Sequence, residues 1–184
     1  MIVKTSLDDA EVRALIDQLP RNIFNVERSA VFTTTTFAKK LLQDRMTDKM
    51  GIPSRVFRRF RVKRKNSRTA GTVWLGLNDV MASYIGSGLS KKNAEGKFAN
   101  QDEGGAWAGK YYFAGGFIAE MKSGHIGIFK RGDGMTKNDK VKLIEQGVNL
   151  KVGYEIADEV ARISEIELRN RFAAKVRELN PAIT

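Results

Sequence analysis

The 184-residue sequence contains no cysteine and only one histidine, His125. Without cysteine, the chain has no disulfide, no thiolate zinc site and no cysteine nucleophile. A single histidine argues against His-rich metal sites, and any Ser-His-Asp arrangement would depend on His125 alone. The sequence also has no P-loop and no dinucleotide-binding fingerprint. We therefore expect no catalytic residues, no metal and no cofactor.

Long apolar runs are also missing. No run of about 18 apolar residues occurs, so a transmembrane helix is not expected. The first 20 residues are acidic and amphipathic, and they lack the basic start and apolar centre of a signal peptide. We expect the protein to remain in the compartment where it is made. Hydrophobic residues make up 42% of the chain, which is enough for a packed core.

Positive charge is concentrated in one stretch, Ser54–Arg68, with the sequence SRVFRRFRVKRKNSR. It contains no acidic residue and supplies +8 of the formal net charge of +11. A local basic patch suits an anionic partner, because counterion release grows with the number of phosphates contacted together. Arginine binds carboxylate as well as phosphate, so DNA and an acidic protein both remain candidates, as does a merely solvated charge run. The predicted DNA- or partner-binding residues are Arg55, Arg58, Arg59, Arg61, Lys63, Arg64, Lys65 and Arg68.

Helical spacing of apolar residues appears twice before the basic stretch. The pattern predicts a helix over 6–20, with Ser6 as its N-cap and Pro20 at its end. A longer helix is predicted over 24–49. The run Thr33–Thr36 within it is unusual, because β-branched residues lose rotamer freedom in helices. We interpret this run as a helix face packed closely against another segment.

The middle of the chain shows strand patterns, and its end shows a helix. The basic stretch is expected to cross a helix-to-strand junction. The predicted strands are 58–65, 70–78, a hairpin of 111–121 and 125–131, and one short strand within 140–150. A long amphipathic helix is predicted over 157–180.

Residues 86–109 are rich in Gly, Ser and Asn and are interpreted as a long surface loop. Phe98 and Trp107 lie within this range, and exposed aromatics on such a loop often await a partner. The alternative is that they fold back onto their own domain. On the first interpretation the loop is an intersubunit arm, with Phe98 and Trp107 as its contacts.

The order of helices, then strands, then a helix indicates an α+β fold. We expect N-terminal helices, an antiparallel sheet with a long inserted loop, and a long C-terminal helix packed on the sheet. No repeat and no linker divides the sequence, so a single domain over 1–184 is predicted.

One weak catalytic pattern deserves a test. Glu120 and Lys122 match the acid-x-Lys arrangement of metal-dependent nucleases, with Asp102 or Glu103 as the second carboxylate that a divalent cation requires. A surface ion pair explains the same residues more simply. The nuclease hypothesis is therefore the weakest of those considered.

Several segments, in order, resemble the prophage minor tail protein Z family, the tail-completion proteins of long-tailed bacteriophages. A helical region precedes the basic segment IPSRVFRRFRVKRK, and the strand TAGTVWLGLNDV follows it. GGFIAEMKSGHIGIFKR is similar to the hairpin of the family, and KVKLIEQGVNLK precedes an Arg-rich C-terminal helix. The resemblance covers roughly 20–180. The 86–109 loop and the acidic first helix depart from the pattern.

This resemblance implies a structural virion protein at the head-proximal end of a phage tail, acting in tail completion and head–tail joining. Similar neck proteins form closed rings, commonly of six copies, around the DNA channel. The implied partners are further copies of the chain, tail-tube or tail-terminator proteins, head–tail connector proteins and packaged DNA, after assembly in the host cytoplasm. The residues alone also permit a sequence-independent DNA-binding protein of a phage or mobile element.

Overall fold

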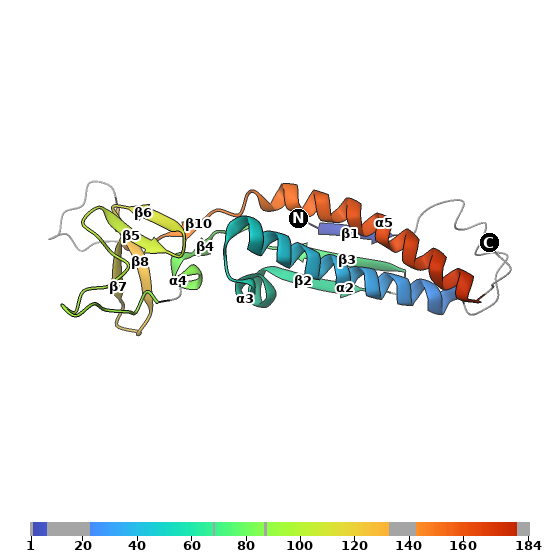
Figure 1. The fold of residues 1–184 in the computed structure, drawn as a ribbon, viewed down its shortest axis with the longest axis horizontal. Helices are drawn as coiled ribbons and strands as arrows, with labels where there is room; N and C mark the ends of the chain where they lie inside the picture. Colours follow the sequence, from blue (N-terminus) through green and yellow to red (C-terminus); the bar gives the residue numbers. More distant parts are fainter. Residues whose placement is uncertain (1, 7–22, 68, 87, 133–142, 180–184) are drawn as a thin grey trace. The chain divides into compact units, whose positions relative to one another are not determined.

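The computed structural model describes residues 2–6, 23–67, 69–86, 88–132 and 143–179 (Figure 1). Side chains are described throughout these ranges except in 2–6 and at residue 60. The fold is α+β, as predicted. The chain forms two compact units, which we call the helical unit (1–50, 57–77 and 151–184) and the hairpin unit (51–56 and 78–150). The single domain expected from the sequence stays a prediction.

The helical unit combines two long helices with one three-stranded sheet. The strand β3 lies between β1 and β2, and both pairs are antiparallel. Its elements are β1 (Ile2–Ser6), α2 (Ile23–Met50), the π-helical turn η1 (Phe57–Arg61), β2 (Val62–Asn66), β3 (Ala70–Leu75) and α5 (Gly153–Leu179). The two long helices confirm the sequence prediction, although α5 begins at Gly153 rather than at residue 157.

The core of this unit forms where α2 and α5 run side by side (Figure 1). One apolar cluster joins the start of α2 to the end of α5, so the two helices are antiparallel. Its members are Ile23, Val26, Ala30, Val31, Leu168, Phe172 and Val176. Both helices also contact the sheet, with α2 against β2 and β3 and α5 against β1. No described helix is long and apolar enough to cross a membrane.

The threonine run lies where α2 packs tightly against β3. Thr34 and Thr35 are completely buried, and a Cβ atom placed on Gly71 of β3 would collide with the Thr35 hydroxyl. The Thr35 hydroxyl donates to the Val31 carbonyl at 2.6 Å, so its burial leaves it paired. The interpretation of this run as a tightly packed helix face is confirmed.

The hairpin unit is built from short strands. They form the pairs β4–β10 and β5–β6 and the three-stranded sheet β7-β8-β9, all antiparallel. Its elements are α3 (Ser54–Val56), β4 (Val80–Met81), α4 (Ala82–Ile85), β5 (Gly105–Ala108), β6 (Tyr111–Ala114), β7 (Phe117–Glu120), β8 (Ile126–Arg131), β9 (Leu143–Glu145) and β10 (Gly147–Val148). The predicted turn is confirmed by the Met121 amide, which donates to the His125 carbonyl at 2.8 Å.

Two predictions about this unit were wrong in part. The strand expected over 111–121 is broken at Gly115, whose φ of +68° is open mainly to glycine. Its first half, β6, pairs with β5, and its second half, β7, pairs with β8. The loop expected over 86–109 ends at residue 104, because 105–108 form β5. Trp107 is therefore a strand residue.

Two predictions in the helical unit also change. The strand expected from residue 58 begins at Val62, because 57–61 form a π-helical turn. The basic stretch does cross a helix-to-strand junction, as predicted. Ser6 ends the strand β1, and the rest of the helix predicted over 6–20 lies outside the described residues.

The contact between α2 and β3 predicts a strong effect of substituting Gly71. We expect Gly71→Ala to lower the free energy of unfolding by about 2–3 kcal/mol, because the new methyl group overlaps the buried Thr35 side chain. Adding Thr35→Ala should recover part of this loss. Urea unfolding followed by circular dichroism measures both. Thr72→Ala, on the same strand, is the control, and an equal loss there would contradict the account.

Candidate interaction surfaces

The π-helical turn η1 presents the first part of the basic stretch. Phe57 is completely buried and fixes the turn to the core. The Gly76 amide donates to the Arg61 carbonyl at 2.8 Å and closes the turn against the end of β3. Arg58 and Arg59 between these two anchors are exposed. The turn therefore holds two adjacent arginines on a backbone fixed at both ends.

Strand alternation then divides the basic residues of β2 between the two faces of the sheet. Successive side chains of a strand point to opposite faces. Arg64 points toward α2, where its guanidinium bonds to the Thr36 hydroxyl and lies 4.6 Å from the centre of the Phe32 ring. Arg64 is thus held against α2 within its own unit, although it remains exposed, and its role in binding stays a prediction.

Lys63 and Lys65 lie on the opposite face of the sheet, which neither helix covers. Lys63 pairs in register with Trp74 of β3, and its Nζ lies 6.0 Å from the centre of the indole. Trp74 is 40% exposed although it lies on the central strand. Thr72 pairs with Lys65 in the same way. We call these four residues the lysine–tryptophan face.

The other predicted basic residues do not join this face. Arg55 is exposed on α3 and belongs to the hairpin unit. Arg61 is half-buried. Arg68 lies outside the described residues. Among the predicted residues of the helical unit that the structure describes, local backbone geometry therefore gives Arg58, Arg64 and Lys65 different surroundings.

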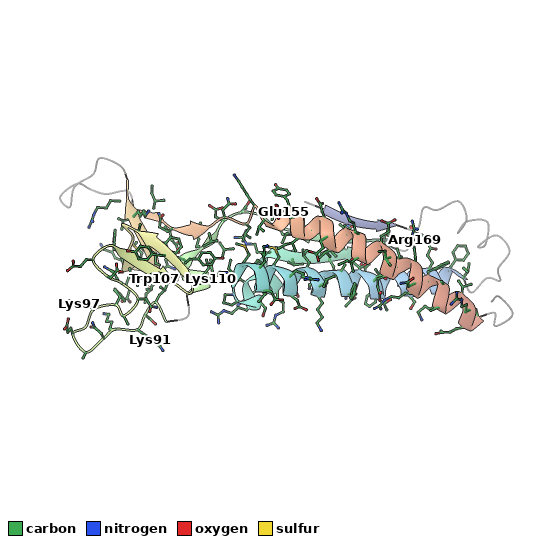
Figure 2. The ribbon with its side chains drawn as sticks, turned by 45° about the horizontal axis from the view of Figure 1, so that its top comes forward. Lys91, Lys97, Trp107, Lys110, Glu155 and Arg169 are labelled. Carbon is green, nitrogen blue, oxygen red and sulfur yellow. The ribbon has the colours of Figure 1, made fainter. Side chains whose placement is uncertain are left out.

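The hairpin unit carries an exposed aromatic pair on β5 and β6. Trp107 lies directly opposite Tyr112, with ring centres 4.5 Å apart and ring planes inclined at 44°. The two side chains are 43% and 41% exposed. Figure 2 labels Trp107 on this hairpin. The small residues Ala106 and Ala108 occupy the opposite, buried face of β5.

Glycine and one carboxylate hold this aromatic pair in place. A Cβ atom on Gly104 would lie 2.7 Å from the Tyr112 hydroxyl, and one on Gly105 would lie 2.9 Å from the Tyr112 ring. A side chain at either position would displace Tyr112, and one at Gly105 would also collide with the Phe113 carbonyl oxygen. Asp102 Oδ1 accepts the Gly104 and Gly105 amides at 2.8 and 2.7 Å and the Tyr112 hydroxyl at 3.2 Å. We call Asp102, Trp107 and Tyr112 the Trp–Tyr platform.

These contacts shift two pKa values. Desolvation is the largest single effect on Asp102 and raises its pKa, but the amide and side-chain hydrogen bonds together outweigh it. The pKa of the Asp102 carboxyl therefore lies below its usual value. The pKa of Tyr112 is raised, first by desolvation and then by the hydrogen bond to Asp102 and its negative charge. The platform thus presents an ionised carboxylate beside a neutral phenol at neutral pH.

The sequence indicated Trp107 but not its partners. The sequence places Tyr112 in a strand without giving it a role, and it offers Asp102 only as a second metal-binding carboxylate. The one local signal for the pair is Gly-Gly at 104–105, where a large ring can lie on bare backbone. Phe98 is half-buried, and the centre of its ring lies 5.3 Å from Lys92 Nζ. Its role as an intersubunit contact stays a prediction.

A second polar cluster surrounds Glu145 on β9. Its Oε1 accepts the Ser83 hydroxyl at 2.6 Å, and its Oε2 lies 3.2 Å from His125 Nε2. Serine and histidine both meet the carboxylate rather than each other, so this is not a nucleophile–base pair. The cluster joins β9 to α4 and to the start of β8. His125 is therefore a hairpin residue, as the sequence suggested.

The residues of the nuclease pattern lie on and beside the β7–β8 hairpin. Glu120 ends β7 and Lys122 lies in the following turn, and both are exposed. Asp102 is occupied by its amide and phenol contacts. Within the described ranges, no group of three or more His, Asp or Glu side chains is arranged to hold a metal ion.

Comparison with protein-family models, with curated proteins and with solved structures found no match.

The division of β2 predicts different effects for adjacent cations. Arg64→Ala should lower the free energy of unfolding by about 1 kcal/mol, because it removes the contacts to α2. Lys65→Ala should change it by less than about 0.5 kcal/mol, as is usual for exposed positions. Thermal unfolding of both variants measures the difference. Equal effects would show that Arg64 is as free as its neighbour.

The Trp–Tyr platform predicts a titration that depends on Asp102. Because Asp102 raises the pKa of Tyr112, Asp102→Asn should lower this pKa toward 10. The neutral Tyr112 phenol stabilises the fold fully below the pKa that Tyr112 has in the unfolded chain. This stabilisation is lost as the pH rises through the raised pKa of the folded state. The ionised Asp102 carboxylate stabilises the fold above its unfolded pKa of 3.8, and this stabilisation is lost as the pH falls through the lowered pKa of the folded state. NMR of the tyrosine rings follows the titration of Tyr112 in the wild type and in the variant.

Proposed function

We propose that this chain is a structural virion protein at the head-proximal end of a bacteriophage tail, acting in tail completion and head–tail joining. The resemblance to the minor tail protein Z family motivates the assignment. It spans the helices, the basic stretch, β3, the β7–β8 hairpin and α5, which together make up much of both units. The protein is proposed to work as a ring of copies that joins tail proteins to connector proteins.

The observation that carries the proposal is the exposure of large aromatic groups on both units. Trp74 on the helical unit and Trp107 with Tyr112 on the hairpin unit are each at least 40% exposed. Aromatic side chains of this kind are typical of the centres of protein interfaces. A ring subunit needs two different surfaces, because each copy meets one neighbour with one face and the next neighbour with another.

The exposed helix α5 adds to this interpretation. Ile166 and Tyr154 are 62% and 53% exposed, although both lie on a helix whose other face is buried. Glu155 and Lys151 are also exposed near Tyr154, so charges of both signs lie beside it. Figure 2 labels Glu155 at the start of this helix. The helical unit therefore offers exposed apolar groups on α5 as well as on its sheet to neighbouring proteins.

A second candidate is a sequence-independent DNA-binding protein. The lysine–tryptophan face favours it, because Lys63 and Lys65 can neutralise phosphates while the exposed Trp74 ring can stack on an unpaired base. In the ring proposal the same lysines contact packaged DNA in the channel or an acidic surface on a tail or connector protein. The two candidate functions differ in one respect. The DNA-binding protein binds DNA as a monomer, whereas the ring subunit meets DNA only after the ring has assembled.

The experiment that tests the proposal supplies the purified protein to tails assembled without it. The tails are then mixed with DNA-filled heads, and the yield of joined particles is measured. The proposal predicts that wild-type protein restores joining. A Trp74→Ala variant with a normal circular dichroism spectrum should restore it at least about tenfold less well, since interface aromatics carry much of the binding energy.

Thr72→Ala is the matched control, because it changes the same face without removing an aromatic ring. It should restore joining at close to the wild-type level. Failure of the wild-type protein to bind tails or restore joining, together with tight and strongly salt-dependent binding of the monomer to DNA, would reject the proposal in favour of the second candidate.

A further inference from the structure

We propose that the Trp–Tyr platform of one copy binds Arg58 of the η1 turn of a second copy. The chains would then associate head to tail. This inference rests on the proposed function, because it identifies the partner of one surface of an assembling subunit. The sequence predicts only Phe98 and Trp107 as intersubunit contacts. This inference names both sides of one contact, a binding surface and the residue that it binds, and both lie on this chain.

The platform is organised before any partner arrives. Trp107 and Tyr112 pack against each other, and the Tyr112 ring lies across the glycine backbone at 104–105. The Tyr112 hydroxyl is also bonded to Asp102, whose carboxylate is fixed by two amides. Side chains that are already ordered lose less entropy on binding, so they provide more net affinity. An exposed aromatic pair held this firmly is suited to recognition.

The chemistry of the platform selects a guanidinium. Flat aromatic faces attract cations, and arginine stacks on them better than lysine because its head group is planar. A carboxylate at the edge of the rings can accept hydrogen bonds from the same guanidinium. Asp102 supplies this carboxylate, and Glu103 adds a second exposed negative charge beside it. An arginine bound here would meet both kinds of contact at once.

The chain uses arginine-on-ring contacts elsewhere. Arg64 lies 4.6 Å from the Phe32 ring centre, and Arg131 lies 4.8 Å from that of Phe117. The first contact lies within the helical unit and the second within the hairpin unit. Arg58 is exposed, and the described residues offer it no ion pair and no ring. It is held outward by the buried Phe57 beside it, so it is available to a second copy.

The two patches are different surfaces, and this determines the geometry of association. A platform has no exposed arginine at its centre, so it does not complement another platform. When the platform of one copy binds the η1 turn of a second copy, the η1 turn of the first copy and the platform of the second remain free to bind further copies. Such heterologous contacts produce a closed ring when the rotation closes and a filament when it does not.

The natural absence of cysteine allows a direct test by cross-linking. One chain carries Glu103→Cys at the rim of the platform, and a second chain carries Arg59→Cys in the turn, which leaves Arg58 intact. Equal amounts are treated with a short bifunctional maleimide, both in concentrated solution and bound to tails. The inference predicts that the mixed dimer exceeds either homodimer by at least about tenfold.

A single substitution then distinguishes recognition from misfolding. Trp107→Ala in the Glu103→Cys chain should lower the yield of the mixed dimer about tenfold, because that chain supplies the platform. The same Trp107→Ala in the Arg59→Cys chain should leave the yield unchanged, because that chain supplies only the turn. Arg58→Glu should show the opposite asymmetry.

Three results would overturn the inference. They are equal effects of Trp107→Ala in the two chains, no effect in either, and no mixed dimer both free and on tails. Each is distinguishable from failure of the proposed function, because restoration of head joining by the wild-type protein is measured separately. A protein that restores joining but gives no mixed dimer keeps its proposed function and loses this contact.

Discussion

The close packing of α2 against β3 is the constraint on which the helical unit depends. Thr35 and Gly71 meet there with no space for another methyl group, and the apolar seam with α5 continues from the same helix. Because both helices pack on one side of the sheet, neither of them covers the other side, where Trp74 is exposed. Arg64 points toward the covered side and Lys63 toward the open one. The distribution of charge on the surface therefore follows from the packing of the core.

The hairpin unit also carries exposed aromatic side chains beside charged groups, but a different structure supports them. Its strands are short, and glycine backbone rather than a helix supports the exposed Trp107–Tyr112 pair. In both units, large aromatic rings are held rigidly at the surface beside charged groups. That combination is costly for a protein that acts alone, since exposed apolar surface favours association. It is well suited to a subunit whose stable state is an assembly, which is the basis of the proposed role in tail completion.

Much of the fold was predictable from the sequence, because helical periodicity in α2 and α5 and the turn at Gly124 are local signals. The surfaces were less predictable. The basic residues of 58–65 look equivalent in sequence, but a π-helical turn followed by a strand gives them different directions. The Trp–Tyr platform depends on the pairing of β5 with β6, which no local pattern in a Gly-rich segment indicates. Such pairings depend on the packing of the whole unit and become visible only in three dimensions.

The most direct test of the central claim is the mass of the protein measured in solution and on purified tails. Single-particle mass measurement gives the copy number in both states. The account predicts that tails incubated with the protein gain a fixed mass at one end, equal to a small whole number of chains, and that Trp74→Ala prevents this gain. A protein that adds no mass to tails and instead coats duplex DNA as separate monomers would contradict the account.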